Sequence, residues 1–420
     1  MSWNAPRLLL ATALVLQVCA TGTATAQDYE PTGHRSAKEI LPAPLLSGPY
    51  HHVDEKVVNL TYQNIYTVQS EFGTFRADND PMLRRLIREI YALAEMRKVT
   101  DSDAFTKAAK DAAKAPLQVG YSLLTDPVDT VSGIPEGAFA LMSRTGTSIG
   151  TFFAGGKSDY EDDSVKAVLA VSSFKREYAN RLGIDVYTRN KHVQEELNRI
   201  GWAAVVGNMA PSVAFAAVGG GIAGTFKTTS YTQKLNNLIA ELPPPELRKR
   251  NEASLKAMGL SVNLIKRFLD HKSYSPRHET VIVESLAVMK GAKGRDKWIT
   301  ALLNASSELD ALFFQQATEM MAGYHQSVSP VVEVTVRGAI PIVHAQDRSV
   351  GVMLPIDYGR WTRISASTVD DIAGIYGKRP DTARVVVWVT GTLSARLKSE
   401  LGRRGFVVTE EEDQKIALMD

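Results

Sequence analysis

Residues 201–226 read GWAAVVGNMAPSVAFAAVGGGIAGTF and contain no charged side chain. Small residues recur along this segment, so another backbone can approach it closely. An uncharged segment of this length must be withdrawn from water, either inside a protein core or against lipid. We expect a buried helical hairpin, because Asn208, Pro211 and the glycines at 219–221 interrupt a single straight membrane span. Membrane contact through residues 201–226 is the alternative.

The segments on both sides of 201–226 have the spacing of amphipathic helices. Residues 165–182 place apolar side chains on one side, Gly183 ends the helix, and a second helix begins at Lys191 and runs into the uncharged segment. Further helices are predicted after the break at Pro243–Pro245, over residues 246–258, 261–271, 278–289 and 296–324. The middle of the chain is therefore expected to be a helical body.

Another helix is expected from Asp80. Asn79 and Asp80 can cap it, and Pro81 suits its first turn. The apolar residues that follow repeat at helical spacing. We expect Arg84, Arg85 and Arg88 to form an ordinary solvated face of this helix.

The two ends of the mature chain favour β-structure. Residues 57–77 are rich in Val, Thr, Tyr and Phe and predict a β-hairpin, whereas residues 27–56 are interpreted as a linker. From residue 328 the pattern becomes strand, helix, strand, which is typical of a small α/β unit. The predicted fold class is α+β, with a mainly helical domain at 57–327 and a C-terminal α/β domain at 328–420.

Residues 1–26 are typical of a secretory signal peptide. Arg7 precedes a short apolar run, and Ala24, Thr25 and Ala26 provide a small-x-small cleavage site. We therefore expect export to the periplasm or the extracellular space. Cys19 lies in a faint lipoprotein-like context, but Val18 departs from that pattern, so lipidation of Cys19 is left open.

Composition limits the chemistry that can be expected. The chain has 48 Lys and Arg against 46 Asp and Glu, and this balance gives no reason to expect a nucleic-acid partner. The sole cysteine lies in the predicted signal peptide. Thiol chemistry and cysteine metal sites are therefore not expected, and the histidines have no recognisable ligand spacing, so no metal is predicted.

One motif is typical of a nucleophile. Gly146, Ser148 and Gly150 match G-x-S-x-G, which in α/β-hydrolases raises a serine hydroxyl on a strand-to-helix turn. His344 and an intervening acid such as Asp310 would follow the chain order of that family. The opposing interpretation is a stripe of small residues where two helices touch. Ser148 and His344 are the candidate catalytic residues of a serine hydrolase.

Residues 219–224 also match G-x-G-x-x-G, the dinucleotide-binding pattern. The pattern requires a preceding strand and an acid about twenty residues later on the next strand. Glu241, the nearest acid, stands just before three prolines, where no strand can present it. No cofactor is predicted.

Several stretches of the chain resemble a group of exported bacterial proteins with no assigned activity. They are YTV at 66–68, FGTF at 72–75, DPV at 126–128, GIP at 133–135 and LGIDVYTRN at 182–190. The resemblance covers most of the mature chain and implies a bacterial envelope or extracellular setting. The resulting hypothesis is an exported binding or structural module whose partner is an unknown protein or envelope component. The alternatives are a serine hydrolase and a membrane-associated protein.

Overall fold

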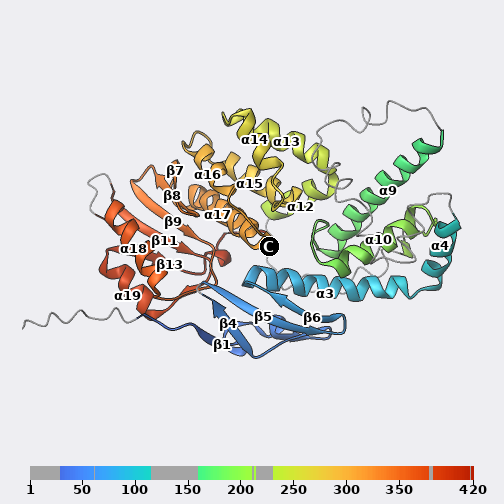
Figure 1. Ribbon diagram of the computed structural model, residues 1–420, viewed down its shortest axis with the longest axis horizontal. Helices are drawn as coiled ribbons and strands as arrows, with labels where there is room; N and C mark the ends of the chain where they lie inside the picture. The colour runs from blue at the N-terminus through green and yellow to red at the C-terminus, as the bar shows by residue number, and fades with distance from the viewer. Residues whose placement is uncertain are drawn as a thin grey trace, which may run out of the picture.

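The computed structural model describes residues 29–60, 62–114, 159–210, 212–213, 230–377, 382–416 and 418–420. Figure 1 shows an antiparallel sheet at the N-terminal side, a group of helices, and a C-terminal sheet with helices on both faces. The α+β fold class predicted from the sequence is confirmed. The predicted signal peptide, Cys19, Ser148 and its flanking glycines lie outside the described residues.

The N-terminal sheet is antiparallel. Its order is β1-β4-β5-β3-β2, and β6 pairs with β5. The strands are β1 (Gly33–Ser36), β2 (Ser47–Gly48), β3 (His51–Val53), β4 (Lys56–Leu60), β5 (Gln63–Ser70) and β6 (Gly73–Ala77), and the short helices α1 (Ala37–Ile40) and α2 (Ala43–Leu46) lie between β1 and β2. The hairpin at 57–77 is present. The interpretation of residues 27–56 as a linker is wrong where the chain is described, because β1 pairs with β4 and β3 pairs with β5.

Helix α3 (Asp80–Thr100) packs on this sheet and begins the helical body. Leu83, Ile87 and Ile90 are fully buried in one core with β3 and β5. The other helices of the body are α4 (Asp103–Lys114), α9 (Asp159–Leu182), α10 (Lys191–Val205), α12 (Ser230–Glu241), α13 (Pro244–Ala257), α14 (Val262–Leu269), α15 (Pro276–Val288), α16 (Arg295–Leu302) and α17 (Glu308–Ser327). The single helix predicted over 296–324 is wrong. Helix α16 ends at Leu302, and a new helix, α17, begins after Ser307. Ser307 caps α17 by accepting a hydrogen bond from the N–H of Asp310 in a capping box.

The described part of the uncharged segment includes the end of α10. Helices α9 and α10 pack together, and Gly201, Trp202 and Ala203 are buried. A Cβ on Gly207 would lie 2.0 Å from the carbonyl oxygen of Ala108, so a backbone does approach closely there. Residues 211 and 214–226 lie outside the described residues. Where helices are described, none combines the length and apolar character needed to cross a bilayer.

The C-terminal sheet has the order β13-β11-β9-β8-β7. β9, β11 and β13 are parallel, whereas β7, β8 and β9 form an antiparallel meander. The elements are β7 (Val331–Arg337), β8 (Ile340–Ala345), β9 (Ser349–Leu354), β10 (Tyr358–Gly359), α18 (Arg363–Tyr376), β11 (Arg384–Val389), β12 (Thr392–Leu393), α19 (Ala395–Arg403), β13 (Phe406–Thr409) and the 3₁₀ turn η1 (Glu412–Gln414). The predicted α/β unit is therefore present.

Both faces of this sheet are covered, as Figure 1 shows. On β11, Val385, Val387 and Val389 pack with α18 and α19, whereas Val386 and Trp388 share a core with α13–α17. Strand side chains alternate between faces, so an apolar strand is expected when both faces are buried. One core thus crosses the boundary predicted at 327/328 and joins the helical body to the sheet.

Candidate functional site

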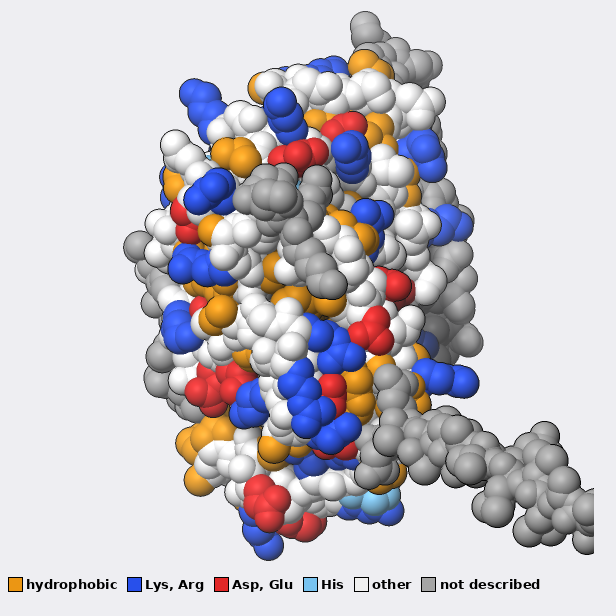
Figure 2. All heavy atoms as spheres, turned by 90° about the vertical axis from the view of Figure 1, so that its left-hand side faces the viewer, with side chains coloured by type: hydrophobic (Ala, Val, Ile, Leu, Met, Phe, Trp, Pro, Cys, Tyr) orange, Lys and Arg blue, Asp and Glu red, His pale blue; other side chains and the backbone are white. Residues whose placement is uncertain are grey.

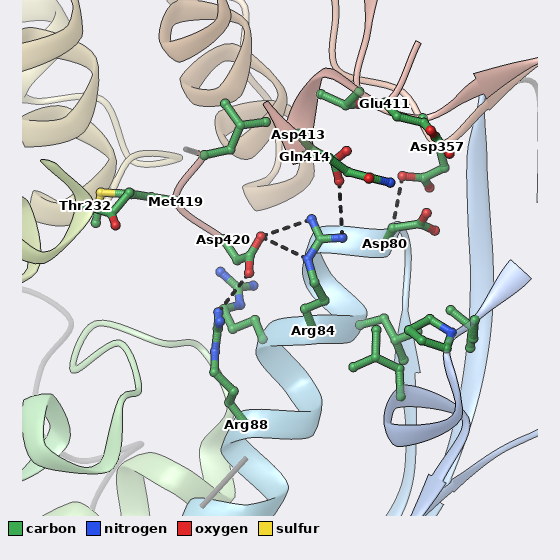
Figure 3. A pocket seen from close by; sticks show the side chains of 18 of the residues that line it. Asp80, Arg84, Arg88, Thr232, Asp357, Glu411, Asp413, Gln414, Met419 and Asp420 are labelled. Atoms are coloured by element: carbon green, nitrogen blue, oxygen red, sulfur yellow. Dashed lines mark hydrogen bonds and ion pairs between the residues drawn. The ribbon is translucent and has the colours of Figure 1, made fainter. Parts of the chain in front are cut away.

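A cavity of about 820 Å³ lies where the N-terminal sheet, the helical body and the end of the chain meet. Its walls come from β1, α1, α2, the start of α3, the turn between α9 and α10, α12, α15, the loops after β9 and β11, and residues 411, 413–416 and 418–420. Figure 3 shows side chains from these elements pointing toward one another. Charged groups of both signs line the cavity, and their arrangement defines the candidate site.

Helix α3 positions the basic side of the cavity. Asn79 caps the helix by accepting a 2.7 Å hydrogen bond from the N–H of Met82, and this fixes the first turn. Arg84 and Arg88 are four residues apart and therefore lie on one side of the helix. The expected solvated face is wrong for these arginines, because the side chains of Arg84 and Arg88 are only 22% exposed and Arg85 is buried. Arg85 instead forms a 2.7 Å ion pair with Glu308 of α17.

The side chain of Asp420 lies between two of these arginines. Arg84 Nη2 lies 3.2 Å from its Oδ1, and Arg88 Nη2 lies 3.1 Å from its Oδ2. Arg277 of α15 donates from Nη2 to the backbone oxygen of Asp420 at 3.2 Å. Arg84 also faces Asp413 at 3.7 Å. Arginines from two helices thus contact one acidic residue, and Figure 3 shows the two from α3, Arg84 and Arg88, pointing toward it.

Burial and neighbouring charges shift the pKa values of Asp420 and Arg88. Burial raises the pKa of Asp420, but the charges of Arg84 and Arg88 outweigh burial and hold that pKa below its ordinary value. Burial lowers the pKa of Arg88, and the charge of Asp420 does not fully offset burial and the repulsion from Arg277 and Arg84. At Arg88, burial and repulsion thus outweigh the attraction of Asp420, whereas Arg84 also faces Asp413 and Arg277 also faces Asp185.

Met419 is bound through its backbone as well as its side chain. Gln315 Nε2 donates to the backbone oxygen of Met419 at 2.9 Å, and Glu319 Oε1 accepts from its N–H at 3.0 Å. The Met419 side chain is 2% exposed and packs with Leu235 and Val281. Neither backbone group of Met419 takes part in a helix or strand, so the side chains of α17 satisfy both.

An acidic pair lies at the first turn of α3, beside Arg84. Asp357 accepts from the backbone N–H of Asn64 at 2.8 Å and from that of Asp80 at 3.1 Å. The Asp80 carboxylate accepts from the Asn64 amide at 3.0 Å and from the Tyr66 hydroxyl at 2.5 Å. Burial and the nearby charge of Asp80 raise the pKa of Asp357 well above its ordinary value. This pair joins the first sheet to the loop after β9.

The turn between α9 and α10 closes a further side of the cavity. Gly183 ends α9 with a φ of +71°, a conformation in which glycine meets no steric penalty. Asp185 follows, accepts from the N–H of Tyr187 at 2.9 Å, and faces Arg277 Nε at 3.9 Å. The end of this turn is held to α3, because Glu89 accepts from the Thr188 hydroxyl at 2.5 Å and from the Asn190 amide at 2.9 Å.

Of the predicted catalytic residues, the structure describes His344 but not Ser148. His344 lies on β8, where its Nε2 is 3.1 Å from the Thr335 hydroxyl and its ring contacts Tyr376. Asp310 is engaged in capping α17. Ser148 lies outside the described residues, so the G-x-S-x-G hypothesis stays a prediction.

The other predicted features lie elsewhere or outside the description. Residues 219–224 are not described, and within the described ranges no group of three or more His, Cys, Asp or Glu side chains could hold a metal ion. Figure 2 shows the face that includes α18 and α19, where basic side chains are interspersed with acidic and apolar ones. On α19, Glu400 pairs with Arg396 and Arg404 at 3.0 and 2.9 Å, so part of this positive charge is neutralised locally.

Sequence reasoning missed the residues that line the cavity. Arg84 and Arg88 were visible only as basic positions of an amphipathic helix, and the partner Asp420 is more than 300 positions away. One signal was present. Three arginines within five residues, at 84, 85 and 88, accompany a helix that packs on two cores, which leaves little surface to solvate them.

No protein-family model, curated protein or solved structure matches this chain. The geometry of the cavity therefore supplies the structural argument for function.

Proposed function

We propose that this chain is an exported, non-enzymatic binding protein whose central cavity binds a carboxylate ligand. The observation that carries the proposal is the arrangement of Arg84, Arg88 and Arg277, which converge on one carboxylate-bearing residue at the cavity wall. Arginine is suited to this role because its planar guanidinium can donate two hydrogen bonds to a carboxylate. The proposal of export rests on the sequence of residues 1–26. The proposed source of the ligand is a component of the bacterial envelope.

Charge and space both support a ligand of this kind. The cavity keeps about 820 Å³ of volume with Asp420 in place, which is the size of sites that take small organic molecules. Burial strengthens ionic contacts at such a site because less water screens them. The carboxylates of Asp80, Asp185 and Glu411 on the same cavity would repel a ligand that carries negative charge throughout. A compact acid with one or two carboxylates fits this distribution better than a polyanion.

No observation on the described residues supports either alternative function, the serine hydrolase or the membrane-associated protein. His344 contacts Thr335 and Tyr376, and Ser148 lies outside the described residues. Membrane association would depend on residues 201–226, most of which lie outside the description.

The test compares succinate with succinamide, which has nearly the same shape without the charge. We expect succinate to raise the thermal unfolding midpoint of the full chain and to release or absorb heat in titration calorimetry, and succinamide to do neither. Arg88→Gln should remove the response to succinate. Arg97→Gln on the same helix should retain it, because Arg97 pairs with Glu71 at an exposed position.

Sodium chloride at matched ionic strength controls for general screening. Equal responses to succinate, succinamide and salt, or a succinate response that Arg88→Gln leaves unchanged, would refute the proposal.

A further inference from the structure

The contacts made by Met419 and Asp420 are those of a peptide in a binding site. Their partners come from α3, α15 and α17, which are distant in the sequence. Side chains bind the N–H and the C=O of one residue, an apolar cluster receives its side chain, and arginines receive the next carboxylate. Peptide recognition uses this combination of backbone hydrogen bonds for affinity and side-chain pockets for specificity.

From these contacts we infer that the cavity wall is a peptide-binding site that reads an apolar residue followed by an aspartate, and that Met419 and Asp420 occupy it in cis. The external ligand is a peptide segment of another protein with the same two-residue chemistry. This inference rests on the proposed carboxylate-binding function and makes it more specific, because it adds recognition of the peptide backbone and of an apolar side chain.

The backbone of Met419, its side chain and the carboxylate of Asp420 are each contacted by a different set of residues. Gln315 and Glu319 are four residues apart on α17 and together bind the backbone of Met419. The pocket for the apolar side chain contains Leu235 and Ile239 of α12 and Val281 of α15. The aspartate carboxylate meets Arg84 and Arg88. A peptide that lacks any one of these features loses a distinct set of contacts.

The site also has properties that suit exchange of its occupant. Residues 418–420 lie outside helices and strands, so releasing them breaks no helix or strand hydrogen bond. The cavity beside them offers space for the displaced residues. An occupant held in cis lowers the apparent affinity for an external peptide in proportion to the fraction of sites that it leaves empty.

The experiment uses the full chain and a tripeptide with the sequence of residues 418–420, acetylated and amidated so that the aspartate side chain is its sole carboxylate. Titration calorimetry measures its affinity for the unchanged chain and for Asp420→Asn, which weakens the internal occupant. We expect binding about tenfold tighter to Asp420→Asn than to the unchanged chain. Replacing aspartate by asparagine, or methionine by serine, in the peptide should weaken binding to the Asp420→Asn chain about tenfold or more.

The peptide variants keep the test decisive even if a protein variant folds poorly, because they leave the protein unchanged. Adding Arg88→Gln to Asp420→Asn should abolish the preference for aspartate over asparagine in the peptide, provided circular dichroism shows the chain folded. Failure of the tripeptide to bind either folded chain overturns the inference, as does binding that ignores both peptide substitutions.

A last comparison separates the two proposals. If succinate and N-acetyl-aspartate amide bind and the tripeptide binds no tighter than they do, the carboxylate site stands and the peptide inference falls. If none of the three binds, both proposals fail.

Discussion

At the scale of single residues, the centre of the molecule holds ionisable groups whose burial determines their behaviour. Glu319 is an example, because its carboxylate is buried between the amide of Gln315 and the N–H of Met419. Burial raises its pKa from the ordinary 4.5 to about 8, and the two hydrogen bonds offset only part of that effect. A site that holds a neighbouring acidic residue with arginines therefore also contains a carboxyl group that is protonated at neutral pH.

This shift predicts the pH dependence of stability. The pKa of Glu319 is higher in the folded chain than in the unfolded chain, so the folded chain binds more protons between pH 4.5 and 8. Its contribution to the free energy of unfolding therefore falls as the pH rises through this window. Glu319→Gln should flatten the profile by roughly 1 kcal/mol per pH unit there. Urea unfolding at a series of pH values measures it.

Glu252→Gln is the matched control, because the Glu252 side chain is 41% exposed and pairs with Lys256 one turn along α13. Its profile should run parallel to that of the unchanged chain. A Glu319→Gln profile that is also parallel would contradict the raised pKa.

Close backbone approach is the second feature at the residue scale. A Cβ on Gly391 would lie 2.0 Å from the carbonyl oxygen of Asp357, whereas a Cβ on Gly402 of α19 would meet nothing within 4 Å. Gly391→Ala should lower the free energy of unfolding by about 1–3 kcal/mol because the backbone must move. Gly402→Ala should be neutral or raise it by about 0.5–1 kcal/mol, since alanine favours a helix. Equal denaturation midpoints for the two variants would show that the loop at Gly391 accommodates a methyl group, which would contradict the close approach.

At the scale of elements, α3 both packs against neighbouring elements and lines the cavity. Its apolar residues pack on the first sheet and on the α9–α10 pair, and Arg84, Arg85 and Arg88 line the cavity. Both sides of the helix are thus occupied near its start. An arginine on such a helix contributes to stability through a particular acidic partner, whereas an exposed arginine mainly contributes charge.

Two substitutions on α3 test this difference. Arg88→Gln removes one of the two arginines that contact the mostly buried side-chain carboxylate of Asp420 in the described structure, and it should cost about 1–3 kcal/mol of unfolding free energy. Arg97→Gln removes an exposed pair with Glu71 and a contact with the ring of Phe72, and should cost under about 1 kcal/mol. Guanidinium unfolding curves compare the two. A loss for Arg97→Gln as large as that for Arg88→Gln would contradict the assigned roles.

The elements could be predicted wherever local signals were strong. The helix starting at Asp80, the hairpin at 57–77 and the strands after 328 follow from caps, periodicity and β-branched residues, and the structure contains them. The first strands were missed because β1 and β2 have four and two residues, too few to display alternation. The break between α16 and α17 was missed because apolar residues continue across it at compatible spacing, although Ser307 and Asp310 carried a capping signal.

At the scale of the whole molecule, the cavity is formed by long-range contacts that no local pattern reveals. Arg84 pairs with a residue 336 positions away, and the N–H of Asn64 pairs with one 293 positions away. Sequence reasoning assigned each group to its own element and could not bring them together without the topology. The site was for that reason unpredicted, while most of the elements that build it were predicted.

The same long-range contacts determine how the molecule should unfold. Asp357 accepts from two buried N–H groups of the first sheet and α3, and the N–H groups of Asp357 and Tyr358 donate to Tyr62. This is a direct link between the N-terminal sheet and the C-terminal unit. Asp357→Ala would leave the N–H groups of Asn64 and Asp80 without that acceptor, at a cost of about 1–3 kcal/mol each.

We therefore expect Asp357→Ala to loosen the N-terminal sheet selectively, because the C-terminal sheet keeps its own core with α13–α17. Hydrogen exchange should become faster in β4 and β5 than in β9 and β11, and calorimetry should show a broader transition. Asp370→Ala is the control, since Asp370 is exposed and its ion pair with Arg404 lies within the C-terminal unit. If Asp357→Ala accelerated exchange equally in both sheets, the two would unfold as one cooperative unit, and the link through Asp357 would not be what joins them.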